Sequence, residues 1–574
     1  MNPNKTNYRN FKVAVYCRVE DVVGMADDDW MVGGLDVLQQ SVKIDKVYLE
    51  THRSMQVVDR AVVEKAKVFF NSRGIQTSGG ITLVADEHDM YRTFCYSDPE
   101  HRAYVRDVVA YTAELFDEVI LDDFFFTNCK CPRCIAAKGM QSWSEFRLAQ
   151  MADAAQNLVI APAREVNPNA NLILKYPNWY AHFHYTGYNL EDAPPIFDMI
   201  YTGTETRDPV HQHQHLQAYQ SYALMRYLEH IKPGKNGGGW VDPGSRATLD
   251  RYSEQLSLTL FAKAMELTLF SFSDLLQAVQ DETGISKLTS TVAPVAGVTL
   301  DYADTVMGHL GEPYGLASYR PYHSSGEDYV HHYLGMLGIP IDLYPEFPTE
   351  SDTVLLTACT AADADIVEKI QQQLVVGKRV IITSGLLQAL AGRGIDDIVE
   401  LEYTDKKAQI RDFSQFANVY HSDGHIVIPQ VKYATNDAWE LITCLDKDNG
   451  YPLLLHARYG KGILYVLTIP DNFSDLYQLP VEILKQIRKV VMADFPVYLE
   501  APSKVSLFTY DNHTGIIHSF RDHRTQCQLV VKQPEAQLHD LISGEEIIGS
   551  TRMNESVFEL SIQPHTYCAL RWSA

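Results

Sequence analysis

The chain has 574 residues, 46% of them apolar and 21% charged, so it is a globular protein too long for a single hydrophobic core. Its 73 acidic and 49 basic side chains give a net charge of −24, and a surface this acidic repels phosphate backbones and anionic lipids. We therefore expect neither nucleic acid nor a membrane among its partners, and no apolar stretch reaches the roughly 18 residues of a membrane span.

The first part of the chain alternates short apolar strands with amphipathic helices. Strands are predicted at 11–16, 46–49, 75–82, 118–121, 171–175, 197–201, 238–241 and 267–272, with helices between them, for example at 59–72, 99–115 and 145–165. Alternating strands and helices form parallel sheets, and eight such units over about 280 residues fit a (β/α)8 barrel. No G-x-G-x-x-G motif follows the first strand, so we expect no dinucleotide or other organic cofactor.

Two further regions follow the barrel. Strands at 353–356 and 377–385 flank a helix at 361–374, and more strands are predicted at 426–428 and 459–468; this order is typical of a doubly wound α/β domain. Short alternating segments at 505–510, 515–520, 526–531, 557–562 and 567–572 indicate a small antiparallel sandwich. We therefore divide the chain into a catalytic barrel (1–296), a flavodoxin-like, glutamine-amidotransferase-like domain (297–496) and a β-sandwich (497–574).

A six-residue segment just after the fourth predicted strand contains three cysteines, Cys129, Cys131 and Cys134. Thiolates this close together can converge on one tetrahedral ion, and zinc takes four such ligands at about 2.3 Å. Cys95 is the nearest candidate for the fourth ligand, because it follows the third strand and neighbouring strand-end loops are adjacent in a barrel. Four sulfurs close the coordination shell, so the sequence predicts structural zinc; buried free thiols are the alternative.

The nine cysteines are an odd number and unevenly spread, which argues against a disulfide framework. The first ten residues are polar and carry no apolar core of a secretory signal. Both observations favour a cytoplasmic protein.

Acidic residues at the carboxyl ends of the predicted barrel strands are the candidate catalytic groups, because barrel enzymes place their site there. They are Asp122 and Asp123 after the fourth strand, Glu205 after the sixth and Asp242 after the seventh. Glycoside cleavage needs two carboxyl groups, one protonated and one ionised. Neighbouring strand residues alternate, so we expect Asp122 and Asp123 to point in opposite directions, one toward the barrel mouth and one bracing a loop. The alternative is that both only form salt bridges or cap loops.

Other strand ends carry side chains suited to sugar binding. Aromatic faces can stack on a pyranose, and amide, imidazole and guanidinium groups can bind hydroxyls. The candidates are Glu50, His52, Arg53, Tyr176, Asn178, Trp179, Arg207 and Trp240. Arg53 and Arg207 could bind a carboxylate if the sugar is acidic. The alternating run of His211, His213 and His215 could bind a metal, but we interpret it as a solvated surface segment.

These motifs resemble the glycoside hydrolase family 42 β-galactosidases. That family combines a catalytic barrel, a flavodoxin-like domain often used for trimer contacts and a small β-sandwich, in this order. Its barrel carries a Cys after strand three and a zinc-binding Cys-x-Cys-x-x-Cys cluster after strand four. Residues 95–104 are similar to the first element and residues 129–134 to the second.

The resemblance implies a homo-oligomer, a dimer or trimer, with Asp123 at the family's acid/base position and Asp242 at its nucleophile position. The sequence departs from the family at both places: the family has Asn-Glu after strand four and Glu after strand seven. The polar run around Glu205 makes that residue an equal candidate for the second carboxylate. We interpret the chain as a distant relative with its own carboxylate arrangement.

The sequence thus predicts a glycoside hydrolase that acts in the cytoplasm on an imported oligosaccharide. Two alternatives remain open. One is a barrel lyase or transglycosylase acting on carbohydrate. The other is a non-catalytic sugar-binding or assembly protein derived from a glycosidase.

Overall fold

The computed structural model describes residues 7–207, 214, 216–244, 248–276, 291–433, 435–447 and 449–573. The chain divides into two compact units, Met1–Gly308 and His309–Ala574. The limits 1–296, 297–496 and 497–574 stay a prediction; residue 296 lies inside helix α13 (Val292–Met307), which packs on α11 (Leu249–Phe261). In the described part of the chain, every helix is too short or too polar to cross a lipid bilayer.

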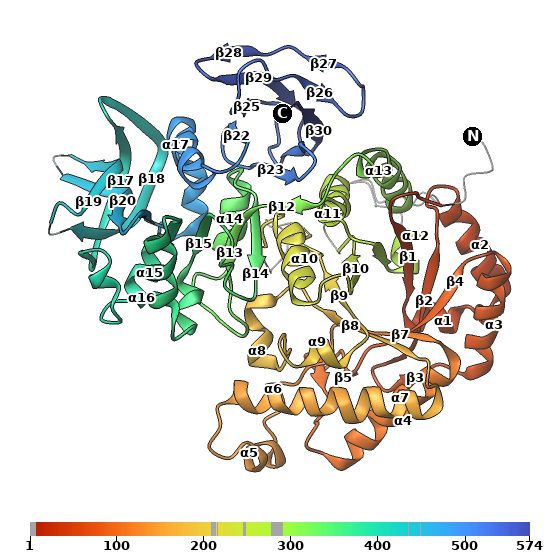
Figure 1. Ribbon diagram of the computed structural model, residues 1–574. Helices are drawn as coiled ribbons and strands as arrows, with labels where there is room; N and C mark the ends of the chain where they lie inside the picture. The colour runs from red at the N-terminus through yellow and green to blue at the C-terminus, as the bar shows by residue number, and fades with distance from the viewer. Residues whose placement is uncertain are drawn as a thin grey trace. The chain divides into compact units, whose positions relative to one another are not determined.

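The first unit is a closed barrel of eight parallel strands, as predicted (Figure 1). The strands are β1 (Lys12–Cys17), β2 (Lys46–Arg53), β4 (Gln76–Ile81), β7 (Glu118–Leu121), β8 (Asn171–Tyr176), β9 (Met199–Gly203), β10 (Asn236–Val241) and β11 (Glu266–Phe270). They pair in sequence order, and β1 closes the barrel by pairing with both β2 and β11. All eight lie on the predicted segments.

Helices surround this barrel. They are α1 (Val19–Gly24), α2 (Asp28–Gln39), α3 (Arg60–Ser72), α4 (Pro99–Leu115), α5 (Pro132–Lys138), α6 (Trp143–Ala154), α7 (Ala161–Val166), α8 (Phe183–Thr186), α9 (Ala193–Ile196), α10 (Gln220–Ile231) and α12 (Phe272–Leu276), together with α11 and α13. The predicted helix at 145–165 is α6, a π-helical turn and α7 in direct succession. Two short hairpins, β3 (Gln56–Val57) paired to β2 and β5 (Val84–Asp86) paired to β6 (Arg92–Thr93), extend from the strand ends.

The barrel interior is filled by aromatic rings, including those of Tyr16, Tyr201 and Trp240. Glycines on the strands make the room these rings need. A Cβ atom at Gly80 would lie 2.6 Å from the Tyr16 hydroxyl, and one at Gly238 would lie 2.5 Å from the Tyr201 hydroxyl. The interior is therefore a packed core, and the candidate functional side chains lie at the carboxyl ends of its strands.

The amino-terminal ends of the barrel strands carry a buried ion cluster of their own. Lys46 Nζ lies 2.7 Å from Glu118 Oε1 and 2.8 Å from Glu266 Oε2. In (β/α)8 barrels this end of the strands contributes to stability, whereas the opposite end carries the chemistry.

The second unit contains a mixed nine-stranded sheet and two smaller sheets. Five strands of the large sheet are parallel: β14 (Ile341–Tyr344), β13 (Leu316–Tyr319), β15 (Thr353–Leu356), β16 (Arg379–Thr383) and β21 (Gly462–Leu467). With α14 (Val330–Met336), α15 (Ile366–Val376) and α16 (Ser384–Ala389), they form the predicted flavodoxin-like core.

The same sheet continues into four long antiparallel strands, most of whose length the sequence does not predict. They are β20 (Asn449–Tyr459), β19 (Ala438–Asp446), β17 (Leu401–Gln415) and β18 (Asn418–Tyr433). Only 426–428 had been predicted as a strand here. Polar and charged residues dominate the exposed faces of these strands, so their apolar pattern is too weak to find from sequence.

The C-terminal part forms the predicted sandwich. One sheet contains β12 (Pro313–Tyr314), β23 (Val505–Tyr510), β24 (Thr514–Ser519), β30 (Tyr567–Trp572), β26 (Leu538–Asp540) and β27 (Glu546–Ile547). The other contains β22 (Val497–Glu500), β25 (Thr525–Val531), β29 (Glu555–Ile562) and β28 (Ser550–Arg552), and α17 (Val481–Val491) precedes it.

Candidate functional site

Lys175, the residue before the last one of β8, is the centre of the candidate site. Its Nζ atom lies 3.2 Å from Asp122 Oδ1, 3.2 Å from Asp123 Oδ2 and 3.5 Å from Glu205 Oε1. It also lies 4.2 Å from the ring centroid of Trp240. The carboxyl ends of β7, β8 and β9 thus bring one buried ammonium group against three buried carboxyl groups. Three carboxylates would carry more negative charge than one ammonium can balance, and this excess favours protonation of some of the carboxyl groups.

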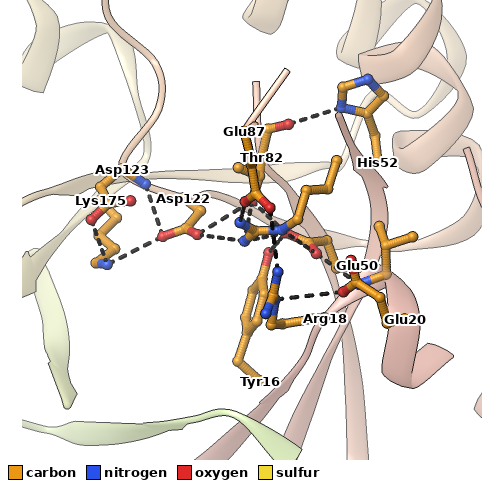
Figure 2. A network of polar contacts seen from close by, with 12 residues as sticks. Tyr16, Arg18, Glu20, Glu50, His52, Thr82, Glu87, Asp122, Asp123 and Lys175 are labelled. Carbon is orange, nitrogen blue, oxygen red and sulfur yellow. Dashed lines mark hydrogen bonds and ion pairs between the residues drawn. The ribbon is translucent and has the colours of Figure 1, made fainter. Parts of the chain in front are cut away.

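Asp122 is the most fully hydrogen-bonded of the three carboxylates. Its Oδ1 accepts from Lys175 and from the Asp123 backbone N–H at 2.8 Å, and its Oδ2 accepts from Arg53 at 3.1 Å and from Thr82 at 3.2 Å (Figure 2). Burial opposes its charge, but the cations of Lys175 and Arg53 outweigh burial and hold the pKa of Asp122 below its usual value. Asp122 is therefore a permanent anion that orders the strand end.

Asp123 and Glu205 behave in the opposite way. Burial, opposed by Lys175 and reinforced by the charge of Asp122, raises the pKa of Asp123 to about 6. Burial, again opposed by Lys175 and reinforced by Asp242, raises the pKa of Glu205 to about 7. Among the described residues, Lys175 is the single hydrogen-bond donor to the carboxyl group of Asp123, and Glu205 Oε2 has no partner. These two groups can therefore hold and release protons near neutral pH.

Asp242 is held in a different manner. It follows β10 directly, and both of its oxygens are bound by Arg207, with Nε–Oδ1 at 2.9 Å and Nη2–Oδ2 at 2.7 Å. Arg207 has a φ of 54°, a conformation that few non-glycine residues adopt. A bidentate ion pair uses one lone pair on each oxygen, so it fixes the orientation of the carboxylate and makes it a weaker nucleophile.

An ion network extends from Asp122 toward β1 and β2 (Figure 2). Arg53 binds both oxygens of Glu50 and also contacts Glu87, which is 3.4 Å from Arg18. Glu50 in turn accepts a hydrogen bond from the Tyr16 hydroxyl at 2.8 Å. Both arginines predicted to bind an acidic sugar, Arg53 and Arg207, thus already bind carboxylates of the chain itself.

The other predicted sugar contacts are distributed unevenly. His52 is buried, with Nδ1 2.8 Å from the Thr82 carbonyl oxygen, and burial lowers its pKa to about 4. Asn178 is buried beside the cluster and donates to the Glu205 carbonyl oxygen at 2.5 Å. Trp240 offers one face to Lys175 and packs on Tyr16.

Two aromatic candidates differ in their placement. The Tyr176 hydroxyl donates to the Asn189 carbonyl oxygen at 2.8 Å, and its ring packs on Tyr188, so the structure does not bring it to the cluster. Trp179 is half-buried and contacts the ring of Phe126. The run of His211, His213 and His215 lies outside the described residues.

One prediction about the aspartates was wrong. Asp122 and Asp123 were expected to point in opposite directions, yet both carboxylates contact the same ammonium. The reason is that β7 ends at Leu121, so the strand alternation does not extend to these residues, and the Asp123 N–H bonds back to Asp122.

Sequence reasoning missed Lys175 and selected its neighbour Tyr176. The signal was present: a lysine at the end of the otherwise apolar segment 171–175 must find carboxylate partners when it is buried. The sequence analysis considered only carboxylates at the strand ends and therefore did not include Lys175, the cation that they share.

The four cysteines Cys95, Cys129, Cys131 and Cys134 lie together, with all sulfur atoms within 4.8 Å of one another. Cys95 Sγ is 3.6 Å from Cys131 Sγ and 3.5 Å from Cys134 Sγ, and all four thiols are free. Four sulfurs at about 2.3 Å from a tetrahedral ion would lie roughly 3.8 Å apart, close to these separations. The cluster can therefore hold a metal ion.

The raised pKa values give a first expectation about stability. Asp and Glu carboxyls of an unfolded chain titrate near about 3.9 and 4.3. Asp123 and Glu205 titrate at about 6 and about 7 in the folded state. Between these limits the folded state binds more protons, so the free energy of unfolding decreases as pH rises, by about 1.4 kcal/mol per pH unit for each carboxyl.

Denaturant unfolding from about pH 4 to pH 8 checks this expectation. The double variant Asp123→Asn/Glu205→Gln has no proton to lose at these positions, so its stability should decline less across the same window. Parallel pH profiles of the two proteins would contradict the titration we describe.

Comparisons with known proteins support the barrel as a catalytic domain. Three family profiles match: "Probable glycosyl hydrolase, catalytic domain" at residues 2–296, "Uncharacterized protein SSO3021, second domain" at 311–472, and "Probable glycosyl hydrolase, C-terminal domain" at 496–572. The uncharacterized protein SSO3021 of Saccharolobus solfataricus is 22% identical over 532 residues, which covers 85% of this chain and 86% of that protein.

Solved structures share the whole fold at low identity. The β-galactosidase of Bacillus circulans sp. alkalophilus superposes with a TM-score of 0.64 at 10% identity, covering 99% of both chains. A catalytic variant of Gan42B, a GH42 β-galactosidase from G. stearothermophilus, gives 0.64 at 10% identity, with 99% and 100% covered. α-L-Fucosidase isoenzyme 2 from Paenibacillus thiaminolyticus gives 0.63 at 10% identity, with 99% and 100% covered.

The expected relationship in fold to the family 42 β-galactosidases is thus confirmed, and it is a relationship of fold alone at this identity. The catalytic-domain profile covers half of the chain, and the matching C-terminal profile follows it. The chain therefore belongs to the family of probable glycosyl hydrolases that these profiles describe.

Proposed function

We propose that this protein is a glycoside hydrolase that cleaves an oligosaccharide with Asp123 and Glu205. One observation carries the proposal: two buried carboxyl groups with raised pKa values meet at one ammonium group on the carboxyl-end face of the barrel. Glycosidic cleavage needs a proton donor and an ionised carboxylate on opposite sides of one bond, and such a pair supplies both.

We assign the two roles as follows, and the variants described below distinguish them. Glu205 is the general acid, because burial raises its pKa to about 7 and part of the population stays protonated at neutral pH. Asp123 is the nucleophile, held in contact with the Lys175 ammonium, which favours its ionised form. The resemblance to family 42 implies the acid/base role for Asp123, so our proposal gives Asp123 the other role. We leave Asp242 out of the pair because Arg207 binds both of its oxygens and balances its charge.

The spacing of the pair supports a retaining reaction. The contacting oxygens of Asp123 and Glu205 lie 3.2 and 3.5 Å from the same nitrogen, so they are separated by no more than the sum of these distances. That limit favours the spacing of about 5–5.5 Å found in retaining enzymes over the 6.5–9.5 Å of inverting ones. We expect the first product to keep the anomeric configuration of the substrate; proton NMR of the early product would contradict this if it showed the opposite anomer.

A panel of α- and β-linked aryl glycosides and natural oligosaccharides tests the proposed activity. Turnover by the wild type, lost in both Asp123→Asn and Glu205→Gln, supports a hydrolase. Incorporation of solvent oxygen into the reducing product separates hydrolysis from a lyase or transglycosylase reaction. Sugar binding without turnover in the wild type would favour a non-catalytic sugar-binding protein instead.

We further propose that the four-cysteine cluster binds structural zinc. The ligand set is all sulfur, and its separations suit a tetrahedral shell without an open position for substrate. Bound zinc would tie the loop after β4 to the loop that leads into α5 and so fix the segment that follows Asp123.

Metal analysis checks the zinc proposal. The wild type should contain about one zinc per chain, and Cys131→Ser should lose most of it and lower the unfolding midpoint by about 5 °C. Cys568→Ser is the matched control, because Cys568 is a half-buried single thiol outside the cluster. Equal zinc contents in the two variants would contradict the assignment.

The cytoplasmic location and the homo-oligomeric state also remain proposals. The nine free cysteines support the first, because a reducing compartment keeps thiols unpaired. Sedimentation of the purified protein decides the second.

A further inference from the structure

Four aromatic rings form a continuous strip next to the candidate carboxylates. We call Tyr91, Phe124, Phe126 and Trp179 the aromatic strip. Tyr91 stacks on Phe124 with centroids 5.5 Å apart and planes 15° apart. The rings of Phe124 and Phe126 are 6.0 Å apart, and those of Phe126 and Trp179 are 6.4 Å apart.

The strip begins at the candidate site itself. Phe124 follows Asp123 directly, and Phe126 packs on Tyr188 at 5.7 Å. The Tyr188 hydroxyl donates a hydrogen bond to the Asp123 carbonyl oxygen, so the segment that carries two of the rings is attached to the segment that carries the carboxylate. Two rings of the strip therefore stand on the same segment as Asp123, one and three residues after it.

The outer end of the strip is exposed. Tyr91 is 54% exposed although it stacks on Phe124, and Phe124, Phe126 and Trp179 are only half-buried. Tyr91 lies in the β5–β6 hairpin with a φ of 53°, a left-handed conformation that costs free energy for a residue with a bulky side chain. The chain thus keeps a large ring accessible to solvent at the outer end of the strip.

The charges near the strip indicate the chemistry of its ligand. Arg92, in the same hairpin, lies 3.4 Å from Asp89 and 3.9 Å from Asp86, so acidic side chains offset its charge. Flat aromatic faces beside a balanced charge suit the C–H faces of uncharged pyranose rings, and the neighbouring carboxyl pair acts on a glycosidic bond in our proposal.

We infer that the aromatic strip binds further sugar units of the substrate, beyond those joined by the cleaved bond. This inference rests on the proposed function and makes it more specific: the substrate is an uncharged oligosaccharide of at least three units. Affinity then increases with chain length until the strip is covered.

Calorimetric titration of the full chain tests the inference. The background is Asp123→Asn, which prevents turnover, and the probes are cello-, xylo-, manno- and galacto-oligosaccharides of one to six units. At least one series should bind more tightly with increasing length. Tyr91→Ala should weaken the longest ligand roughly tenfold, because one stacking contact is lost.

Two variants serve as controls. Tyr91→Phe keeps the ring and should bind within about twofold of the parent. Met90→Ala removes an apolar side chain that is 88% exposed in the same turn, but no ring, and should also stay within about twofold. Equal losses in Met90→Ala and Tyr91→Ala would overturn the inference, as would a length series without any gain in affinity.

The outcomes separate this inference from the proposed activity. Length-dependent binding that Tyr91→Ala removes, in a protein that hydrolyses nothing, would support the strip and contradict the hydrolase. Hydrolysis with an affinity that does not depend on chain length would support the hydrolase and contradict the strip. If Tyr91→Ala dissociates an oligomer in gel filtration and leaves sugar binding intact, the strip binds a second copy of the chain and the inference is wrong.

Discussion

Replacement of Glu205 by Gln is expected to slow hydrolysis of glycosides with poor leaving groups by roughly 10²–10⁴-fold, the usual contribution of a general acid. The same variant should lose far less activity on dinitrophenyl glycosides, because that leaving group departs without a proton. Steady-state kcat/KM values for substrates of increasing leaving-group pKa measure the difference. The glutamine keeps the size of the side chain, so the change removes the proton and little else.

Asp123→Asn should behave differently, because a nucleophile is needed whatever the leaving group. We expect a loss of at least about 10⁴-fold on every substrate of the panel. The reverse pattern, with Asp123→Asn sensitive to the leaving group and Glu205→Gln uniformly inactive, would contradict our assignment and restore the roles of family 42. Similar losses in Asp242→Asn would contradict the exclusion of Asp242; we expect its main effect to be on stability, through Arg207.

Replacement of Lys175 by Met is expected to lower the free energy of unfolding at neutral pH by about 3–5 kcal/mol. The Lys175 side chain is 2% exposed and contacts Asp122, Asp123 and Glu205. Its loss leaves Asp122 in contact with Arg53, but leaves the buried Asp123 and Glu205 without a cation in contact. Their pKa values rise further, and they protonate in the folded state. Denaturant unfolding should therefore show a large deficit near pH 7 that shrinks toward pH 4, where these carboxyls are protonated in the unfolded chain as well.

A double-mutant cycle isolates the contact. Asp123→Asn removes one charge that Lys175 neutralises, so the pair of changes should cost less stability than the sum of the single changes. An additive result would show that Lys175 stabilises the fold without coupling to Asp123.

The barrel offers a matched control at its other end. Lys46 also lies between two carboxylates, those of Glu118 and Glu266. Lys46→Met should destabilise the barrel to a similar degree, yet it should leave the acidic and basic limbs of the pH–rate profile in place. Lys175→Met should shift the limbs to higher pH, since both candidate carboxyls lose the ammonium that lowers their pKa values. Identical pH–rate profiles in Lys46→Met and Lys175→Met would show that Lys175 has a structural role only.

The largest part of the fold was predictable because it depends on local periodicity. Apolar segments recurring between amphipathic helices located all eight barrel strands. Alternation located five strands of the sandwich, from β23 (Val505–Tyr510) to β30 (Tyr567–Trp572), but not its shorter strands or β22 (Val497–Glu500). Most of the hairpin β17–β18 was missed because its strands are largely exposed or half-buried and carry charges on much of their length. A weak apolar pattern leaves little for a sequence analysis to detect.

The candidate site was predictable only as a set of strand-end positions. The sequence by itself determined that Asp122, Asp123, Glu205 and Asp242 follow barrel strands, and that four cysteines stand on adjacent loops, because parallel strands in a barrel end on one face. Which carboxyl groups can exchange protons was decided by the tertiary structure alone. Protonation depends on burial and on the nearest countercharge, and those countercharges, Lys175 for Asp123 and Arg207 for Asp242, come from other strands whose side-chain contacts no local pattern records.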